Sequence, residues 1–266
     1  MSARPNRVTT RTLAAMRLEN QPISMLTAYD YPTARLLDAA GVDVLLVGDS
    51  LAMVVQGHST TLPVTLDQMI YHAEMVARAA ERAMVLVDLP FPEGQLSIER
   101  TVEAAARVLK ETRATAVKLE GGAEQAQRIE ALAAAGIPVM AHVGLRPQNV
   151  HVDGGYRVQR DAQKLITDAR VAEASGAFAV LIECVPAKVG EEITRAIEIP
   201  TIGIGAGPDT SGQVLVFHDL VGLSEGYLPR FVKPYAATGA TITEAAKNYC
   251  EDVRSRRYPG PEHTFK

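Results

Sequence analysis

Four carboxylates each stand at the end of a short apolar run, and together they suggest one site of chemistry. The runs are uncharged and rich in Val, Leu and Ile, as is typical of strands buried on both faces of a parallel sheet. The acids that end them are Asp49, Asp88, Glu120 and Glu183. A single acid of this kind can simply cap the helix that follows it. Acids at four strand ends favour one acidic pocket at the carboxyl end of a parallel barrel, where the sites of that architecture lie.

Three of these acids, Asp49, Asp88 and Glu120, would form a set of hard oxygen ligands. Two carboxylates ~4 Å apart repel each other by about 4 kcal/mol at an effective dielectric constant of about 20. If the three carboxylates lie close together, one of them must therefore take up a proton, or a cation must lie between them. Oxygen ligands with room for water favour Mg²⁺ or a similar divalent ion over Zn²⁺, which prefers His and Cys. We therefore expect this set to bind a divalent metal.

Three further side chains stand beside the acids. Alternate residues of a strand share a face, so Lys118 points the same way as Glu120. Lys118 can bind an anionic substrate carboxylate or an oxyanion, or it can pair with Glu120 alone. His142 can donate to a developing oxyanion or serve a structural role, and Ser50 can bind a substrate oxygen or belong to a turn. We carry all three as candidate substrate-binding residues.

Glu183 is the candidate general base. Its strand falls on the other side of the predicted strand circle from the metal set. A well-placed general base contributes roughly 10²–10⁴-fold in rate. Burial beside Ile182 and Val185 would raise the pKa of Glu183 toward neutrality, where a base is most useful.

The elements that must position these residues follow from hydrophobic periodicity. Strand-like runs recur roughly every 20 to 40 residues and alternate with helical patterns, which indicates repeated β–α units without a domain break. A single (β/α)8 barrel over residues 1–266 is the most economical closure, with an N-terminal arm at about 1–20 and an irregular tail at about 257–266. A doubly wound open sheet is the main alternative. The lack of a Gly-x-Gly-x-x-Gly motif after the first strand counts against it.

Some boundaries are less sharply defined by the pattern. Residues 51–63 and 148–159 are expected to be long loops, and loops of that length in a compact barrel are often functional. The second of them is a candidate flap. The eighth strand is expected somewhere within 214–223. Thr241 to Glu244 has the pattern of a capping box that opens a last helix.

Composition and charge exclude several classes of function. The net charge of −4 argues against binding a nucleic-acid backbone, and 5% aromatic residues with no Trp argue against a base-stacking platform. No apolar run approaches the ~20 residues of a membrane span, and no apolar signal segment follows the basic N-terminus. Cys184 and Cys250 lack metal-ligand spacing. We therefore expect a reduced, cytoplasmic protein.

Seven motifs in order along the chain resemble the ketopantoate hydroxymethyltransferase family. The resemblance runs from about residue 20 to His263. The motifs are Leu26-Thr27-Ala28-Tyr29-Asp30, Leu46-Val47-Gly48-Asp49-Ser50, Asp88-Leu89-Pro90-Phe91, Val117-Lys118-Leu119-Glu120-Gly121-Gly122, His142-Val143-Gly144-Leu145, Glu183-Cys184-Val185-Pro186 and Ile202-Gly203-Ile204-Gly205-Ala206-Gly207.

The resemblance implies a specific activity on a TIM barrel of the isocitrate lyase/phosphoenolpyruvate mutase-like type. Members transfer a hydroxymethyl group from 5,10-methylenetetrahydrofolate to 3-methyl-2-oxobutanoate (α-ketoisovalerate), which gives ketopantoate for pantothenate and coenzyme A biosynthesis. Carried over by motif, Glu183 matches the proton acceptor. The metal-binding acids match Asp49, Asp88 and Glu120, and the ketoacid positions match Asp49, Ser50, Asp88 and Lys118. A homo-oligomer, a decamer in this family, is also implied.

Departures from the family pattern lie in loops expected to border the site. After Gln159 the chain enters a helix almost directly, where the family has a Gly-rich charged loop. Pro92-Glu93-Gly94 follows Phe91 where the family typically has Gly-Ser-Tyr, and Arg146 stands where Thr is usual. These changes leave the metal set intact and bear on folate affinity and substrate choice. The alternatives are a divergent paralogue acting as a metal-dependent ketoacid lyase or aldolase, and a non-catalytic ligand-binding barrel.

Overall fold

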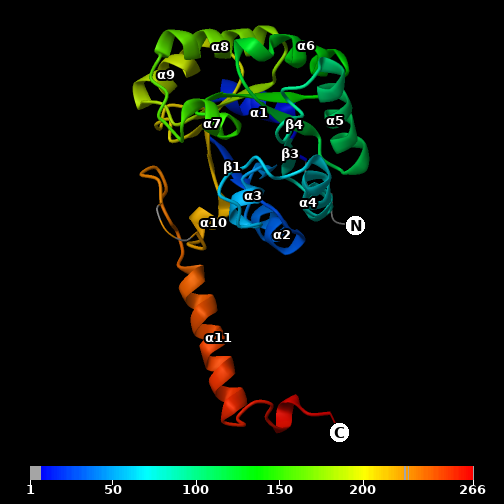
Figure 1. The fold of residues 1–266 in the computed structure, drawn as a ribbon, viewed down its shortest axis with the longest axis vertical. Coiled ribbons are helices and arrows are strands. Elements are labelled where there is room, and N and C mark those ends of the chain that lie inside the picture. The colour runs from blue at the N-terminus through cyan, green and yellow to red at the C-terminus, as the bar shows by residue number, and fades with distance from the viewer. Residues whose placement is uncertain (1–6, 225, 227, 266) are drawn as a thin grey trace. The chain divides into compact units, whose positions relative to one another are not determined.

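Eight parallel strands in chain order close into a barrel, with β8 paired to β1 (Figure 1). The computed structural model describes residues 7–224, 226 and 228–265. The strands are β1 (Ile23–Thr27), β2 (Val44–Val47), β3 (Met84–Asp88), β4 (Ala116–Glu120), β5 (Val139–Gly144), β6 (Ala179–Glu183), β7 (Thr201–Ile204) and β8 (Gly212–Leu215). This confirms the expected (β/α)8 barrel and excludes the open sheet.

Helices follow the strands and surround them (Figure 1). Several begin where the sequence places a capping side chain: the carboxylates of Asp30 and Asp161 and the hydroxyls of Thr65 and Ser97 each accept a backbone N–H of the first turn. The main helices of the layer are α2 (Tyr31–Ala39), α4 (Leu66–Ala79), α5 (Ile98–Glu111), α6 (Ala126–Ala134), α8 (Ala162–Ala174) and α9 (Ala187–Ala196).

Short helical segments occupy the connections that the sequence leaves as loops. They are α3 (Leu51–Val54), η1 (Ala123–Gln125), η2 (Pro147–Asn149) and α7 (Val150–Asp153). The expectation of irregular loops at 51–63 and 148–159 was therefore only partly right. Four-residue helices leave too short a hydrophobic pattern to detect from sequence.

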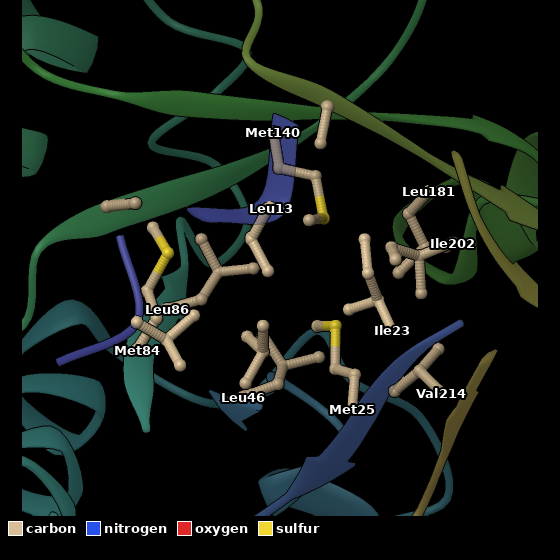
Figure 2. Packing of buried hydrophobic residues seen from close by; sticks show 14 residues of the cluster. Leu13, Ile23, Met25, Leu46, Met84, Leu86, Met140, Leu181, Ile202 and Val214 are labelled. Carbon is tan, nitrogen blue, oxygen red and sulfur yellow. The ribbon is translucent and has the colours of Figure 1, made fainter. Parts of the chain in front are cut away.

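The barrel interior is filled by alternate side chains of the strands. Figure 2 shows residues such as Met25, Leu46 and Leu86 directed into one shared core. Leu13 of α1 (Thr10–Leu18) joins this core, and the backbone of Val8 is bonded to Arg82, just before β3 begins. The N-terminal segment therefore closes the amino end of the barrel, which leaves the carboxyl end free for a site.

The chain divides into two compact units, residues 1–216 and 217–266. The first contains the barrel. The second contains α10 (Phe217–Leu220), α11 (Thr238–Arg254) and η3 (Pro261–His263). That all 266 residues form one domain stays a prediction. Among the described residues, no helix is both long and apolar enough to span a membrane.

Two expected boundaries near the C-terminus were wrong. β8 begins at Gly212, before the expected range. The backbones are so close there that a Cβ on residue 212 would lie 2.3 Å from the carbonyl oxygen of Ile23 in β1. Only glycine allows that approach, and glycine is a poor strand signal. The proposed capping box is not a cap: α11 begins three residues earlier, and the hydroxyls of Thr241 and Thr243 bond back to carbonyls within or just before the helix.

Candidate active site

The alternation that fills the barrel core also brings polar side chains to its mouth. Two residues after a core position in several strands, the inward side chain becomes polar, as with Leu86 and Asp88 or Leu181 and Glu183. These side chains line one small cavity of about 80 Å³, so its occupant must be compact. Every residue predicted for the site lines it: Asp49, Ser50, Asp88, Lys118, Glu120, His142 and Glu183.

Lys118 is a buried cation at the centre of the cavity. Its strand is in register with β3 so that Lys118 lies opposite Asp88, and its Nζ is 3.0 Å from Asp88 Oδ1. The partner is thus Asp88 and not Glu120 alone. Burial by itself would lower the pKa of Lys118, but the attraction of Asp88 and Glu120 raises it above its ordinary value. Lys118 is therefore charged at neutral pH.

His142 lies between Lys118 and Glu183. Burial and the charge of Lys118 lower the pKa of His142 well below its ordinary value, so the imidazole is neutral. Its Nδ1 is 3.1 Å from Lys118 Nζ. Because an ammonium group can only donate, Nδ1 must accept and the ring proton must sit on Nε2. That atom lies 3.2 Å from Glu183 Oε2 without forming a hydrogen bond to it, so the two groups are close neighbours in the cavity.

Glu183 is placed at the rim of the cavity with its main chain fixed. Its carbonyl accepts the N–H of Leu145 at 2.9 Å. Cys184, the next residue, has a left-handed φ of 49°, which turns the chain away sharply and leaves Glu183 at the strand end. Burial raises the pKa of Glu183 to about 7, against the attraction of Lys118. Since 19% of its side chain stays exposed, Glu183 can reach a ligand.

Asp49 and Ser50 enter from the turn after β2. The N–H of Asp49 donates to Asp88 Oδ2 at 3.0 Å, and burial together with repulsion from Asp88 raises the pKa of Asp49 to about 7. A Cβ on Gly48 would lie 2.9 Å from Ser50 Oγ and 3.4 Å from Asp88 Oδ2, so glycine is what allows this turn to pack so closely.

Two residues that contact the site were not among the predicted ones. Tyr29 is buried and its hydroxyl is 2.8 Å from Ser50 Oγ. Gln148 donates from its side chain to Asp49 and from its backbone to Glu120. Tyr29 is the second residue after the first strand, and this place at a strand exit is a signal that could have found it. Gln148 lies in a segment without periodicity, and no signal marks it.

The acids fit a divalent cation by the chemistry of their oxygens. Buried Glu120 Oε1 accepts no hydrogen bond, and Asp88 Oδ1 has the ion pair with Lys118 in place of one. Burial and repulsion from Asp49 raise the pKa of Glu120 well above its ordinary value. Within the described part of the chain, no three His, Cys, Asp or Glu side chains already stand as a metal-binding group. Mg²⁺ is usually held by one or two carboxylates together with water and substrate oxygens. A site in which fewer than three carboxylates bind the ion directly would therefore suit it.

Solved structures with the same fold place the barrel in a known class. The phosphoenolpyruvate phosphomutase of Streptomyces platensis subsp. rosaceus superposes with a TM-score of 0.63 at 17% identity, covering 92% of this chain and 88% of that one. A 2,3-dimethylmalate lyase, described as a PEP mutase/isocitrate lyase superfamily member, gives 0.60 at 16% identity, covering 97% and 91%. The fold is thus the one seen in these PEP mutase/isocitrate lyase-type barrels, an architecture whose sites lie at the carboxyl ends of the strands.

Closer relatives establish the family. The model of the ketopantoate hydroxymethyltransferase family matches residues 7–261. The 3-methyl-2-oxobutanoate hydroxymethyltransferase of Rhodopirellula baltica is 65% identical over 263 residues, covering 99% of this chain and 98% of that protein. The enzyme of the same name from Desulforapulum autotrophicum is 52% identical, covering 98% and 99%. The chain belongs to the ketopantoate hydroxymethyltransferase family, which confirms the expectation of an enzyme that transfers a one-carbon unit.

Proposed function

We propose that this protein transfers a hydroxymethyl group from 5,10-methylenetetrahydrofolate to 3-methyl-2-oxobutanoate and so forms 2-dehydropantoate (ketopantoate). Relatives up to 65% identical over nearly the whole chain carry the name of this activity. The observation that carries the proposal is that a largely buried Glu183 of raised pKa and a buried Lys118 line one small cavity. A base and a cation so arranged suit the removal of a proton next to a carbonyl.

The ketoacid is small, which suits a compact cavity, and its negative charge suits Lys118 and the proposed cation rather than the acids. Lys118 supplies a fixed positive charge for a carboxylate or keto oxygen. Ser50 and His142 add polar groups on the same cavity wall, and Asp49 and Asp88 complete the proposed ketoacid-binding set. The remaining lining includes Leu46, Leu181 and Val214, which suit a branched apolar side chain.

In the proposed reaction Glu183 takes the proton from C3 of the ketoacid. The electron pair of that C–H bond moves into a C2–C3 double bond, and the keto oxygen gains negative charge. Lys118 lies where it can stabilise that charge, and a pKa near 7 suits a general base at neutral pH. C3 then bonds to the methylene carbon of the folate, and both carbon–nitrogen bonds that hold this carbon break. Water supplies the hydroxyl group of the product. The proton taken by Glu183 and the second proton of the water pass to the two folate nitrogens, and tetrahydrofolate leaves.

The proposed metal ligands are Asp49, Asp88 and Glu120, with Mg²⁺ or another divalent cation as the ion. When bound, it would act as a Lewis acid that makes the C3–H bond easier to ionise. Its positive charge would also offset the burial of several carboxylates beside a single buried lysine, among them Glu120, whose Oε1 accepts no hydrogen bond.

Oligomer formation and location remain predictions beside this activity. We propose a homo-oligomer, and the family resemblance implies a decamer. The structure buries no side chain of α11, whose exposed apolar residues include Ile242, Tyr249 and Val253. Apolar surface of that kind favours contact with another chain. A cytoplasmic location with no nucleic-acid or membrane partner also stays a prediction, with Cys184 and Cys250 both free.

Deuterium exchange at C3 of 3-methyl-2-oxobutanoate tests the proposal. Purified protein with Mg²⁺ in D₂O should wash out the C3 proton signal in ¹H NMR, and Glu183→Gln should slow this by at least about 100-fold while Mg²⁺ binding persists. Adding the folate donor should yield ketopantoate. Exchange without ketopantoate would point to a ketoacid lyase or aldolase. No exchange in the native protein would favour a ligand-binding barrel without catalysis.

A further inference from the structure

Gln148 makes more contacts to the proposed metal ligands than its place in a loop suggests. It lies in η2, between β5 and α7, and is only 7% exposed. Its Nε2 donates to Asp49 Oδ2 at 2.9 Å and to the carbonyl of Leu89 at 3.0 Å. Its backbone N–H donates to Glu120 Oε2 at 3.0 Å. One residue therefore bonds two of the three acids.

The orientation of the Gln148 amide is fixed by its partners. Both hydrogens of Nε2 are used, and Oε1 accepts a hydrogen bond from Nε2 of Gln95 at 2.8 Å. Rotating the amide by half a turn would set Oε1 against two acceptors, the Asp49 carboxylate and the Leu89 carbonyl. Since buried polar groups are costly to leave unpaired, the observed orientation is the stable one. It directs a donor at Asp49 permanently.

The segment that carries Gln148 is also anchored beside the proposed base. At its start the N–H of Leu145 donates to the carbonyl of Glu183, and at its end the N–H of Gln159 donates to the carbonyl of Cys184, both at 2.9 Å. Between these anchors, the Tyr156 hydroxyl contacts Met53 Sδ at 3.7 Å. Segment 145–159 thus begins and ends beside the main chain of residues 183–184, and between these ends Gln148 contacts Asp49 and Glu120.

We propose that Gln148 is a positioning residue that fixes Asp49 and Glu120 in the orientation needed to bind the divalent cation. The inference rests on the proposed function, since it assigns Gln148 to the same cation. Each acid gives one oxygen to Gln148, which leaves its other oxygen to turn toward the ion. A glutamine suits this position because it donates to a carboxylate without adding or removing charge. Groups that hydrogen-bond metal ligands commonly change metal affinity by about 10–100-fold when removed.

Magnesium affinity measured by calorimetry tests this role in the full-length protein. Gln148→Met keeps the side-chain volume and removes the amide, and Gln148→Asn keeps the amide but withdraws it by one methylene. Both leave the backbone bond to Glu120 in place. We expect either change to weaken Mg²⁺ binding by about 10-fold or more. The matched control is Gln159→Met, on the same segment, because the Gln159 side chain bonds only to the Arg157 carbonyl.

A merely structural role for Gln148 predicts a different result. It would lower the unfolding temperature of the metal-free protein and leave the Mg²⁺ affinity of the folded protein unchanged. Native affinity in both Gln148 variants, with the native protein binding Mg²⁺, would overturn the inference and leave the proposed function standing. If the native protein binds no Mg²⁺ yet exchanges the C3 proton, the positioning role falls together with the metal set, while Glu183 keeps its role.

Discussion

The raised pKa of Glu183 makes its charge depend on pH in the neutral range. Burial raises that pKa to about 7, and only the carboxylate can accept a proton. We predict that C3 exchange rises about tenfold per pH unit below pH 7 and levels off above it. Initial exchange rates at saturating Mg²⁺ between about pH 5.5 and 8.5 measure this. A flat profile over that range would mean that Glu183 is ionised throughout or is not the base.

Most of the site residues that were predicted from the sequence lie in strands, whereas those that were missed lie outside them. Asp88, Lys118 and Glu183 lie on the inward face of a strand, so their convergence follows from alternation and barrel closure. Tyr29 and Gln148 contact the site through a strand exit and a loop, where no period relates a residue to its neighbours. The strand exit could have pointed to Tyr29, whereas the contacts of Gln148 follow from the folded chain alone.

At the level of the elements, the pairing of β5 with β6 fixes the position of Glu183. A substitution of Gly144, which lies opposite Glu183 in this pairing, tests how much the pairing matters. Gly144 has a φ of 96°, and a Cβ there would lie 2.2 Å from the carbonyl oxygen of Glu183. Gly144→Ala must therefore push the two strand ends apart and break the bond from Leu145. We predict that it greatly slows C3 exchange and lowers the unfolding free energy by more than the about 1–2 kcal/mol of left-handed backbone strain.

Gly136→Ala is the matched control for that prediction. Gly136 also has a left-handed φ, 76°, but a Cβ there would meet nothing within 4 Å. This variant should show only the backbone strain, about 1–2 kcal/mol in urea unfolding, and keep native exchange. Equal losses of exchange in the two variants would show that strain alone, and not the contact with Glu183, explains the effect.

For the whole molecule, the repeated β–α pattern was enough to predict the barrel, because most of its strands are buried and leave strong apolar runs. It was not enough for the end of the chain. Gly212 weakens the signal of β8, and Thr241 and Thr243 resemble a cap although they lie inside α11. α11 begins after Ala237, whose side chain offers no cap, so capping chemistry in the sequence does not mark its start.

The buried acids also link the stability of the whole barrel to pH and to Mg²⁺. In the folded protein the pKa of Asp49 is raised to about 7 from an ordinary 3.8, by burial and by Asp88. Between these values the folded state holds a proton that the unfolded state has lost. The unfolding free energy of the metal-free protein therefore falls as pH rises through this window, by at most about 1.4 kcal/mol per pH unit for each such group.

We predict that Asp49→Asn makes the metal-free protein lose less stability than the native protein between about pH 5 and 7. Asp209→Asn, at an exposed acid, should leave the native slope unchanged. Mg²⁺ at about 100 times its Kd should raise the native unfolding free energy by about 2.7 kcal/mol at neutral pH, and the Asp49 variant should gain less. Urea unfolding at several pH values, with and without Mg²⁺, measures both effects. Parallel pH curves for native and Asp49→Asn protein would show that Asp49 is ionised in the folded state without a cation.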